Sequence, residues 1–309
     1  MGAEPTEEPK GKTVSYSQFK LWTECPYEWK LRYVDKHRTE SGNIWSLLGT
    51  SLHEVIQDYL TTLYGQTIKA ADAMDLDALL LTRLQANFES ARDGNEGIPI
   101  CTYDEIMESY VDGLAIIKEL KSKRGDYFPK KGVELLGIEL PLKVEVRENL
   151  YFTGFIDVIL KDDDMIRIID IKIANKGWNA WKKKDEARLA QLRLYKKFYS
   201  ELYNVPMPSI VVEYVIFKRK LYDNVDFPQK RIQHFKPSQG RPSINASYAL
   251  FESFLDACFD TNGDYATGAV HKKNPAKFNC SFCPYGPKGN MSHLCDQDGV
   301  LVEIWEPPC

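Results

Sequence analysis

The chain of 309 residues carries a formal net charge of −4, and 43% of its residues are hydrophobic. This composition predicts a folded protein with a substantial core and excludes a chain that is disordered throughout. No apolar run approaches the roughly 20 residues of a membrane span, which excludes a helical membrane protein. Seven cysteines, an odd number, and the lack of a signal peptide predict a reducing, cytoplasmic location.

The hydrophobic patterns divide the chain into successive parts. Residues 1–12 are acidic, contain proline and lack an apolar period, so we expect a disordered tail. Residues 13–309 are expected to form a single α/β domain without internal repeats. We expect a helical cap over 13–130, a core with a mixed β-sheet over 131–236, and a helix followed by a cysteine-rich segment over 237–309.

The first strong helical pattern contains a histidine. The segment LLGTSLHEVIQDYLTTLYG predicts a helix from about Leu48 to Tyr64, because its apolar residues recur every three or four positions and Gly65 follows. His53 lies beside this apolar stripe. A histidine at such a place is more often a core or rim residue than a ligand, so the pattern leaves both roles open.

Two short apolar runs, residues 151–160 and 165–174, flank a charged turn and predict a β-hairpin. With an even-length turn, alternation places Asp157, Asp170 and Lys172 on one face. Such a set can hold a hard divalent cation and stabilise a developing oxyanion, which suits phosphodiester hydrolysis. The alternative is that these acids face solvent, as acids in strands commonly do.

The next predicted helix, DEARLAQLRLYKKFYSELY, places two polar side chains one turn apart. Gln191 and Tyr195 therefore project from one face. Ordinary helix packing accounts for this spacing equally well, so the pattern alone assigns them no role.

The cysteine-rich segment has the spacing of a metal site. Cys280, Cys283 and Cys295 lie among glycine, proline and serine residues, and a CxxC pair with a third cysteine suggests metal ligation, with zinc as the general expectation. The fourth ligand is either the nearby His293 or the distant Cys25. The other cysteines fit no ligand pattern and are expected to be packing or surface thiols: Cys101, Cys258 and Cys309.

The acidic net charge does not by itself indicate a nucleic-acid-binding protein. Several lysine-rich segments nevertheless contain aromatic residues, a combination that can bind phosphates and stack on unpaired bases. Lysine runs are usually solvated faces, which is the alternative. The aromatic candidates for stacking are Trp178, Trp181, Tyr195, Phe198 and Phe217.

The order GxIDxxL followed by IIDIK resembles the core of the PD-(D/E)XK nuclease superfamily. Asp157 stands at the family's first acid, and Asp170, Ile171 and Lys172 stand at its (D/E)XK. The resemblance implies a restriction-endonuclease-like mixed sheet flanked by helices. It also implies that both aspartates and the Ile171 carbonyl hold Mg²⁺ or Mn²⁺ while Lys172 orients or helps to deprotonate water. The proline that often precedes the first acid is absent here.

Two further motifs resemble the RecB-like branch of this superfamily. GTSLHE contains His53, which the resemblance places close to the metals, and QLRLY contains Gln191 and Tyr195, which it places facing the nuclease centre and the DNA backbone. Glu139, in the strand-like segment VELLGIELPL, resembles an upstream glutamate of the same group.

Cys25 together with Cys280, Cys283 and Cys295 resembles the iron-sulfur staple of the AddB and CRISPR-associated RecB-like nucleases. This resemblance selects Cys25 over His293 and implies a four-iron four-sulfur cluster. The gap between the last two cysteines is longer than is usual in the family, so Cys295 is the ligand that departs most from the pattern.

The resemblance as a whole implies a metal-dependent deoxyribonuclease. We expect an exonuclease acting on single-stranded or end-bearing DNA in recombination, repair or phage DNA metabolism, in the cytoplasm of a prokaryotic or phage-infected cell. The expected partner is a helicase or recombination protein, and no association with a membrane is expected. The alternatives are a non-catalytic iron-sulfur module that binds DNA or protein, and an endonuclease within a CRISPR-adaptation or recombination complex.

Overall fold

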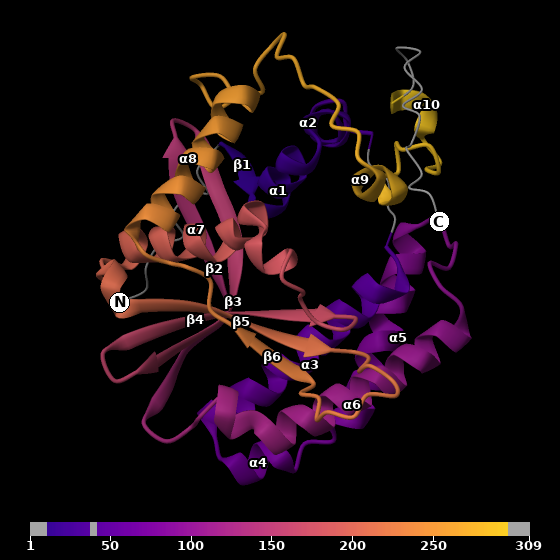
Figure 1. Cartoon of the computed structure of the whole chain (residues 1–309), viewed down its shortest axis with the longest axis vertical. Helices are drawn as coiled ribbons and strands as arrows, with labels where there is room; N and C mark the ends of the chain where they lie inside the picture. The colour runs from indigo at the N-terminus through magenta and orange to yellow at the C-terminus, as the bar shows by residue number, and fades with distance from the viewer. Residues whose placement is uncertain (1–10, 38–41, 296–309) are drawn as a thin grey trace, which may run out of the picture. The chain divides into compact units, whose positions relative to one another are not determined.

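The computed structural model of the chain describes residues 11–37 and 42–295 (Figure 1). Residues 1–10 of the expected tail over 1–12, and Cys309, lie outside these residues, whereas Lys12 already belongs to a strand. The chain divides into two compact units, each built from separate stretches of sequence. The terminal unit comprises Met1–Thr39, Lys143–Gly154 and Tyr248–Cys309, and the core unit comprises Glu40–Leu142 and Phe155–Ser247.

The core unit contains most of the regular structure. Its helices and strands are α3 (Ile44–Gly65), α4 (Ile68–Asp72), α5 (Leu76–Gly94), α6 (Tyr103–Tyr127), β4 (Met165–Ala174), the 3₁₀ helix η2 (Lys182–Lys184), α7 (Glu186–Tyr203), the 3₁₀ helix η3 (Met207–Ser209), β5 (Ile210–Lys218) and β6 (Ile232–Phe235). Two long strands belong to both units: β2 (Val133–Arg147) and β3 (Leu150–Asp162). Among the described helices, none is long and apolar enough to cross a membrane.

The strands form a mixed sheet in the order β1-β3-β4-β5-β6, with β2 also paired to β3. Strands β3 and β4 are antiparallel and joined by a tight turn, since Asp162 pairs with Met165. Strands β4 and β5 are parallel and connected through α7, as a parallel pair requires a crossover. The predicted mixed sheet flanked by helices is confirmed.

Helix α3 begins where Asn43 and Ser46 cap each other and runs along one face of the sheet. The predicted apolar stripe is confirmed, because all of its members are inaccessible to solvent: Leu48, Leu52, Val55, Ile56, Tyr59, Leu60 and Leu63. This stripe packs with α5, α6 and the sheet residues Ile169, Ile171 and Val215. Helix α7 contacts strand residues whose side chains point away from α3. The Tyr214 hydroxyl, for example, donates a hydrogen bond to the Arg188 carbonyl at 2.9 Å.

The terminal unit is held by aromatic packing. Its elements are β1 (Lys12–Ser15), α1 (Tyr16–Glu24), α2 (Pro26–Trp29), the π-helix η1 (Lys30–Val34), α8 (Arg241–Cys258, which begins in the core unit), α9 (Lys277–Phe282) and α10 (Ser292–Cys295). The edge-to-face and tilted ring contacts join α1, α2, β3 and α8. Their buried rings are Phe19, Trp29, Phe152, Phe251 and Phe254.

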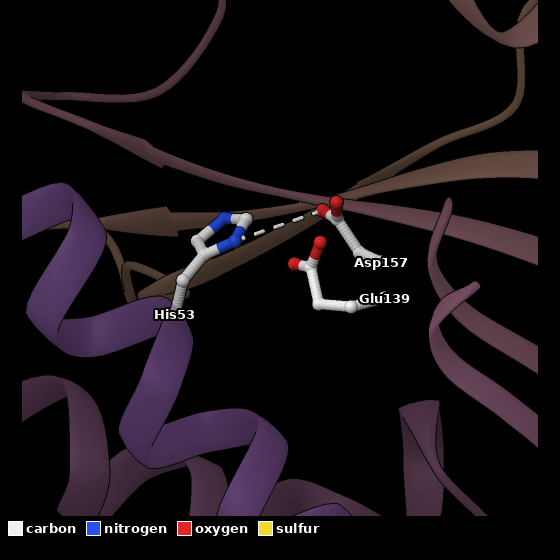
Figure 2. A group of neighbouring side chains, drawn as sticks. All are labelled: His53, Glu139 and Asp157. Carbon is white, nitrogen blue, oxygen red and sulfur yellow. Dashed lines mark ion pairs between the residues drawn. The ribbon is translucent and has the colours of Figure 1, made fainter. Parts of the chain in front are cut away.

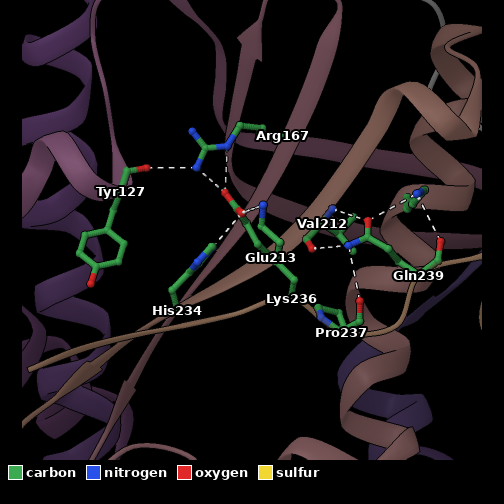
Figure 3. A network of polar contacts seen from close by, with 9 residues as sticks. Tyr127, Arg167, Val212, Glu213, His234, Lys236, Pro237 and Gln239 are labelled. Carbon is green, nitrogen blue, oxygen red and sulfur yellow. Dashed lines mark hydrogen bonds and ion pairs between the residues drawn. The ribbon is translucent and has the colours of Figure 1, made fainter. Parts of the chain in front are cut away.

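A buried carboxylate on β5 gathers cations from neighbouring strands (Figure 3). Glu213 is inaccessible to solvent. Arg167 Nε donates to its Oε1 at 3.0 Å, and His234 Nε2 donates to its Oε2 at 2.8 Å. Lys236 Nζ lies 3.3 Å from the same Oε2. A buried charge with so many partners is an ion-pair network that ties β4, β5 and the end of β6 together.

Candidate active site

Two acidic side chains lie opposite each other on the β3–β4 hairpin. The ladder pairs Val158 with Ile169, so Asp157 and Asp170 occupy the next facing positions. Asp157 Oδ2 accepts a hydrogen bond from the Ile171 N–H at 2.7 Å. Asp170 is 2% exposed and the Asp157 side chain 12% exposed, so both carboxylates are largely removed from water. The two-residue turn between β3 and β4 thus places Asp157 and Asp170 opposite each other, as alternation along the strands predicts.

Lys172 reaches back toward Asp170 on the same face of β4. Its Nζ donates to Asp170 Oδ1 at 2.9 Å and lies 2.7 Å from Oδ2. The buried Oδ2 nevertheless accepts no hydrogen bond within the described part of the chain, because the contact with Nζ does not have hydrogen-bond geometry. The close Lys172 ammonium compensates the charge of this carboxylate, while the hydrogen-bonding capacity of Oδ2 stays available to a ligand.

His53 approaches the hairpin from α3 (Figure 2). Its Nε2 lies 2.6 Å from the Ile171 carbonyl oxygen, and its Nδ1 lies 3.9 Å from Asp157 Oδ2. A carbonyl oxygen can only accept, so this contact assigns the proton to Nε2 and leaves Nδ1 with a lone pair. The backbone carbonyl that the sequence predicts as a metal ligand therefore orients the histidine, an arrangement typical of metal-binding imidazoles.

Glu139 completes a group of three candidate ligands. Atoms of His53, Glu139 and Asp157 all lie within 4.8 Å of one another (Figure 2). Glu139 lies in the interior of β2 yet has a φ of +48°, in the left-handed region that costs about 1 kcal/mol or more for a residue with a side chain. Its Oε1 accepts a hydrogen bond from Gln57 at 2.5 Å. The strained backbone is typical of a strand irregularity that redirects a side chain beside a functional site.

The carboxylates and the lysine influence each other's protonation. Burial, followed by the charge of Asp170, raises the pKa of Asp157 well above its usual value. Burial would lower the pKa of Lys172, but the two aspartates outweigh it and raise that pKa. Burial and the Lys172 charge lower the pKa of His53, which keeps the imidazole neutral. Lys172 is therefore a cation, and His53 is in the form that binds metals.

Helix α7 brings its two predicted residues to the same place. The side chains of Gln191 and Tyr195 are hydrogen bonded to each other, and Tyr195 is 5% exposed. Burial raises the pKa of Tyr195, and the charges of Asp170 and Asp157 raise it further. The phenol is therefore a hydrogen-bond donor beside the carboxylates as well as part of the packing of α7.

These residues fit a divalent cation. The donors are carboxylate oxygens and one neutral imidazole nitrogen, a set that suits Mg²⁺ or Mn²⁺. Asp170 Oδ2 accepts no hydrogen bond within the described residues beyond its ion pair with Lys172, and burial followed by the Asp170 charge raises the pKa of Asp157. A bound cation would satisfy the first and relieve the repulsion in the second.

Sequence reasoning was wrong about four stacking candidates and did not find one supporting residue. The side chains of Trp178, Tyr195, Phe198 and Phe217 are at most 6% exposed, so they are core residues that cannot stack on bases. Gln57, which holds Glu139, was not predicted. The available signal was its position one helical turn after His53 on the same face.

The four predicted cluster cysteines all lie in the terminal unit. Within the described residues they do not form a group as close as His53, Glu139 and Asp157. Cys283 is hydrogen bonded to the Glu28 carboxyl, and burial followed by the charge of Glu28 raises the pKa of Cys283 to about 12.

Hydrogen bonds hold the cysteine-rich segment against the start of the chain. The side chains of Asn274 and Asn279 both donate to the Glu24 carbonyl, at 2.9 and 3.0 Å. The segment itself turns too tightly for side chains at two glycines. A Cβ at Gly286 would lie 2.3 Å from the Cys280 carbonyl oxygen, so only glycine fits there.

Comparisons with known proteins agree with this geometry. The chain matches the model of the PD-(D/E)XK nuclease superfamily over residues 13–287 and therefore belongs to that superfamily. Among solved structures it is similar to a proposed exonuclease from Eubacterium rectale, with 12% identity, a TM-score of 0.52, and coverage of 100% of this chain and 97% of the other. That likeness supports the fold.

A second solved structure, that of SSO0001, has 11% identity and a TM-score of 0.35 over 91% of this chain and 86% of the other, and supports no argument. Among curated proteins no significant match is found. The sequence resemblance to the nuclease superfamily is thus confirmed.

Proposed function

We propose that this protein is a metal-dependent deoxyribonuclease of the RecB-like branch, acting as an exonuclease on single-stranded or end-bearing DNA. The observation that carries the proposal is the convergence of His53, Glu139, Asp157 and the Asp170–Lys172 pair from α3, β2, β3 and β4. We further propose that it acts in the cytoplasm during recombination, repair or phage DNA metabolism, alongside a helicase or recombination protein.

The residues of the site divide into ligands and donors. His53 Nδ1, Glu139, Asp157 and Asp170 would hold Mg²⁺ or Mn²⁺, which supplies Lewis-acid stabilisation of the charge that develops on the attacked phosphate. Lys172 is cationic and fixed by Asp170, so it orients the attacking water and donates to a phosphate oxygen rather than acting as the base.

Gln191 and Tyr195 bind the DNA backbone in this proposal. A protonated phenol and a side-chain amide both donate hydrogen bonds to phosphate oxygens, which positions a backbone without reading its sequence. Their mutual hydrogen bond limits the rotamers available to each, so the strand meets preorganised donors.

The purified protein tests this function on linear and circular single-stranded DNA, labelled at either end, with Mg²⁺, Mn²⁺ or EDTA. We expect loss of linear DNA only, with cleavage abolished by EDTA. The label that is released first gives the polarity. Loss of circles would establish an endonuclease instead, and binding without cleavage of either DNA would favour a non-catalytic module.

We also propose that Cys25, Cys280, Cys283 and Cys295 bind a four-iron four-sulfur cluster in the terminal unit. The hydrogen bonds of Asn274 and Asn279 to the carbonyl of Glu24, the residue before Cys25, support this proposal. A cluster linking segments so far apart in sequence would stabilise the fold by several kcal/mol in the chain-entropy picture.

The proposed cluster predicts a brown protein with broad visible absorption when it is purified without oxygen. Cys25→Ser is expected to remove the colour and lower the melting temperature, whereas His293→Ala should change neither. A colourless protein with one equivalent of zinc, lost in His293→Ala, would instead assign the local zinc site.

A further inference from the structure

Two basic loops follow the neighbouring strands β4 and β5. Residues 175–188, which include η2 and the first turn of α7, and residues 218–231, which begin at the last residue of β5, each contain five Lys or Arg and two Asp or Glu, although the chain as a whole is acidic with a net charge of −4. Some of these charges are paired: Asp185 with Arg188, Glu186 with the buried Arg193, and Lys220 with Glu108 and Asp112 of α6. Each segment still has three more cations than acids, which exceeds the two acids that α6 adds. The local field of the two loops is therefore positive.

The two loops lie side by side. The N–H groups of Arg219 and Lys220 donate to the carbonyls of Ala174 and Asn175, at 2.9 and 3.0 Å, which extends the β4–β5 pairing into the loops. Lys176 Nζ lies 4.6 Å from the centre of the Tyr222 ring, which joins one loop to the other. We call the two segments together the loop surface.

Each loop exposes a large aromatic ring from an ordered turn. Trp181 is 61% exposed and Tyr222 is 53% exposed. Asn179 accepts from the Lys182 N–H at 2.9 Å in the turn that carries Trp181. Gln229 both donates to and accepts from the Tyr222 backbone, each at 2.7 Å. Rings held out of the core on fixed backbones, among lysines, are typical of a binding surface.

The loop surface adjoins the active site. Ala174, where the first loop begins, is two positions along β4 from Lys172. Arg188, in the first turn of α7, accepts a hydrogen bond at its carbonyl from Tyr214, which pairs with Asp170 across β4 and β5. The Arg188 guanidinium lies 5.3 Å from the ring of Trp178, which fixes it on the same loop. A strand bound to the loops would therefore lie beside the catalytic residues.

We propose that the loop surface binds single-stranded DNA and directs it to the active site, an inference that rests on the proposed nuclease function. Bases in a duplex are stacked on each other and hidden from Trp181 and Tyr222, so a duplex would meet only the lysines. An unpaired strand can place its bases on the rings and its phosphates on Lys176 and Lys182–Lys184 at once. The surface thus selects the unpaired substrate.

The test compares the Trp181→Ala/Tyr222→Ala double variant with wild type and with Tyr103→Ala, an exposed tyrosine outside the loops. Affinity is measured by fluorescence anisotropy on a single strand and on its duplex in EDTA. We expect the double variant to lose about tenfold per ring on the single strand, since stacking carries this much affinity. Duplex affinity should change by less than about threefold, and Tyr103→Ala should match wild type.

A second variant and a small substrate separate this inference from the nuclease function. Replacing Lys182–Lys184 with glutamine should reduce the slope of log affinity against log salt concentration by about 2 for the single strand. Each phosphate contact contributes roughly 0.7 to this slope. Cleavage of a thymidine nitrophenyl phosphodiester, which has one base, by wild type and Tyr103→Ala measures the nuclease chemistry separately from strand binding. Unchanged single-strand affinity, or equal losses on strand and duplex, would overturn the inference. Selective loss of single-strand binding without any cleavage by wild type would uphold it and refute the nuclease.

Discussion

Asp170→Asn is expected to reduce DNA cleavage at least about a thousandfold without unfolding the protein. The change preserves the shape of the side chain but removes the charge that holds Lys172 and would hold the metal. A thousandfold loss corresponds to about 4 kcal/mol of transition-state stabilisation, which lies within what a bound metal supplies. The rate is measured on linear single-stranded DNA in saturating Mg²⁺ or Mn²⁺.

The same substitution has two opposing effects on stability without metal. Burial and the Asp170 charge raise the pKa of Asp157, so removing that charge relieves a repulsion in the folded state. In EDTA this relief offsets part of the cost of breaking the Asp170–Lys172 ion pair, so the melting temperature of Asp170→Asn should fall by no more than a few degrees. The matched control is Asp164→Asn in the exposed hairpin turn, which should cleave like wild type. Activity within tenfold of wild type in Asp170→Asn would refute the assigned role.

Glu213→Gln is expected to lower the free energy of unfolding by about 3 kcal/mol at neutral pH. Burial alone would raise the pKa of Glu213, but the hydrogen bond from His234 and the charge of Arg167 outweigh burial and lower the pKa to about 2 from an ordinary 4.5. Each unit of such a shift corresponds to about 1.4 kcal/mol. The glutamine would leave the cations without their counter-charge in the core of the sheet.

The pH dependence gives the sign of this effect. Because the pKa of Glu213 is lower in the folded state, its stabilisation is complete above about pH 4.5 and is lost as the pH falls toward about 2. Urea unfolding of wild type and Glu213→Gln should therefore differ at pH 7 and converge at acidic pH. Glu201→Gln, which removes a half-exposed partner of Lys197, should cost less than about 1 kcal/mol. A constant difference across this pH range would contradict the network.

Much of the core unit could be predicted from periodicity. The stripe of α3 and the β3–β4 hairpin follow from short-range patterns, since each depends on a helical or strand period that a single segment carries by itself. Alternation also places Asp157 and Asp170 across from each other, because the register of a hairpin is set by the length of its turn. The relative position of these two aspartates can therefore be predicted from the local sequence alone.

Features that depend on distant segments could not be predicted. The left-handed φ of Glu139 and its hydrogen bond from Gln57 arise only when β2 and α3 meet. Strand β1, Lys12–Ser15, has four residues and forms by pairing with the start of β3, so no local pattern marks it. The position of Trp178 likewise depends on a distant segment, because the side chain of Gln233 in β6 forms hydrogen bonds with the backbone N–H and carbonyl of Trp178.

The hydrogen bond between His53 and the Ile171 carbonyl spans 118 residues of sequence. A chain emerging from the ribosome therefore carries its histidine long before it carries the strand that fixes the orientation of that histidine. Glu139 and Asp157 come later as well, from strands that must first be paired. The group of candidate metal ligands therefore exists only after α3 has packed against β2 and β3, so a chain that lacks any of these elements cannot assemble it.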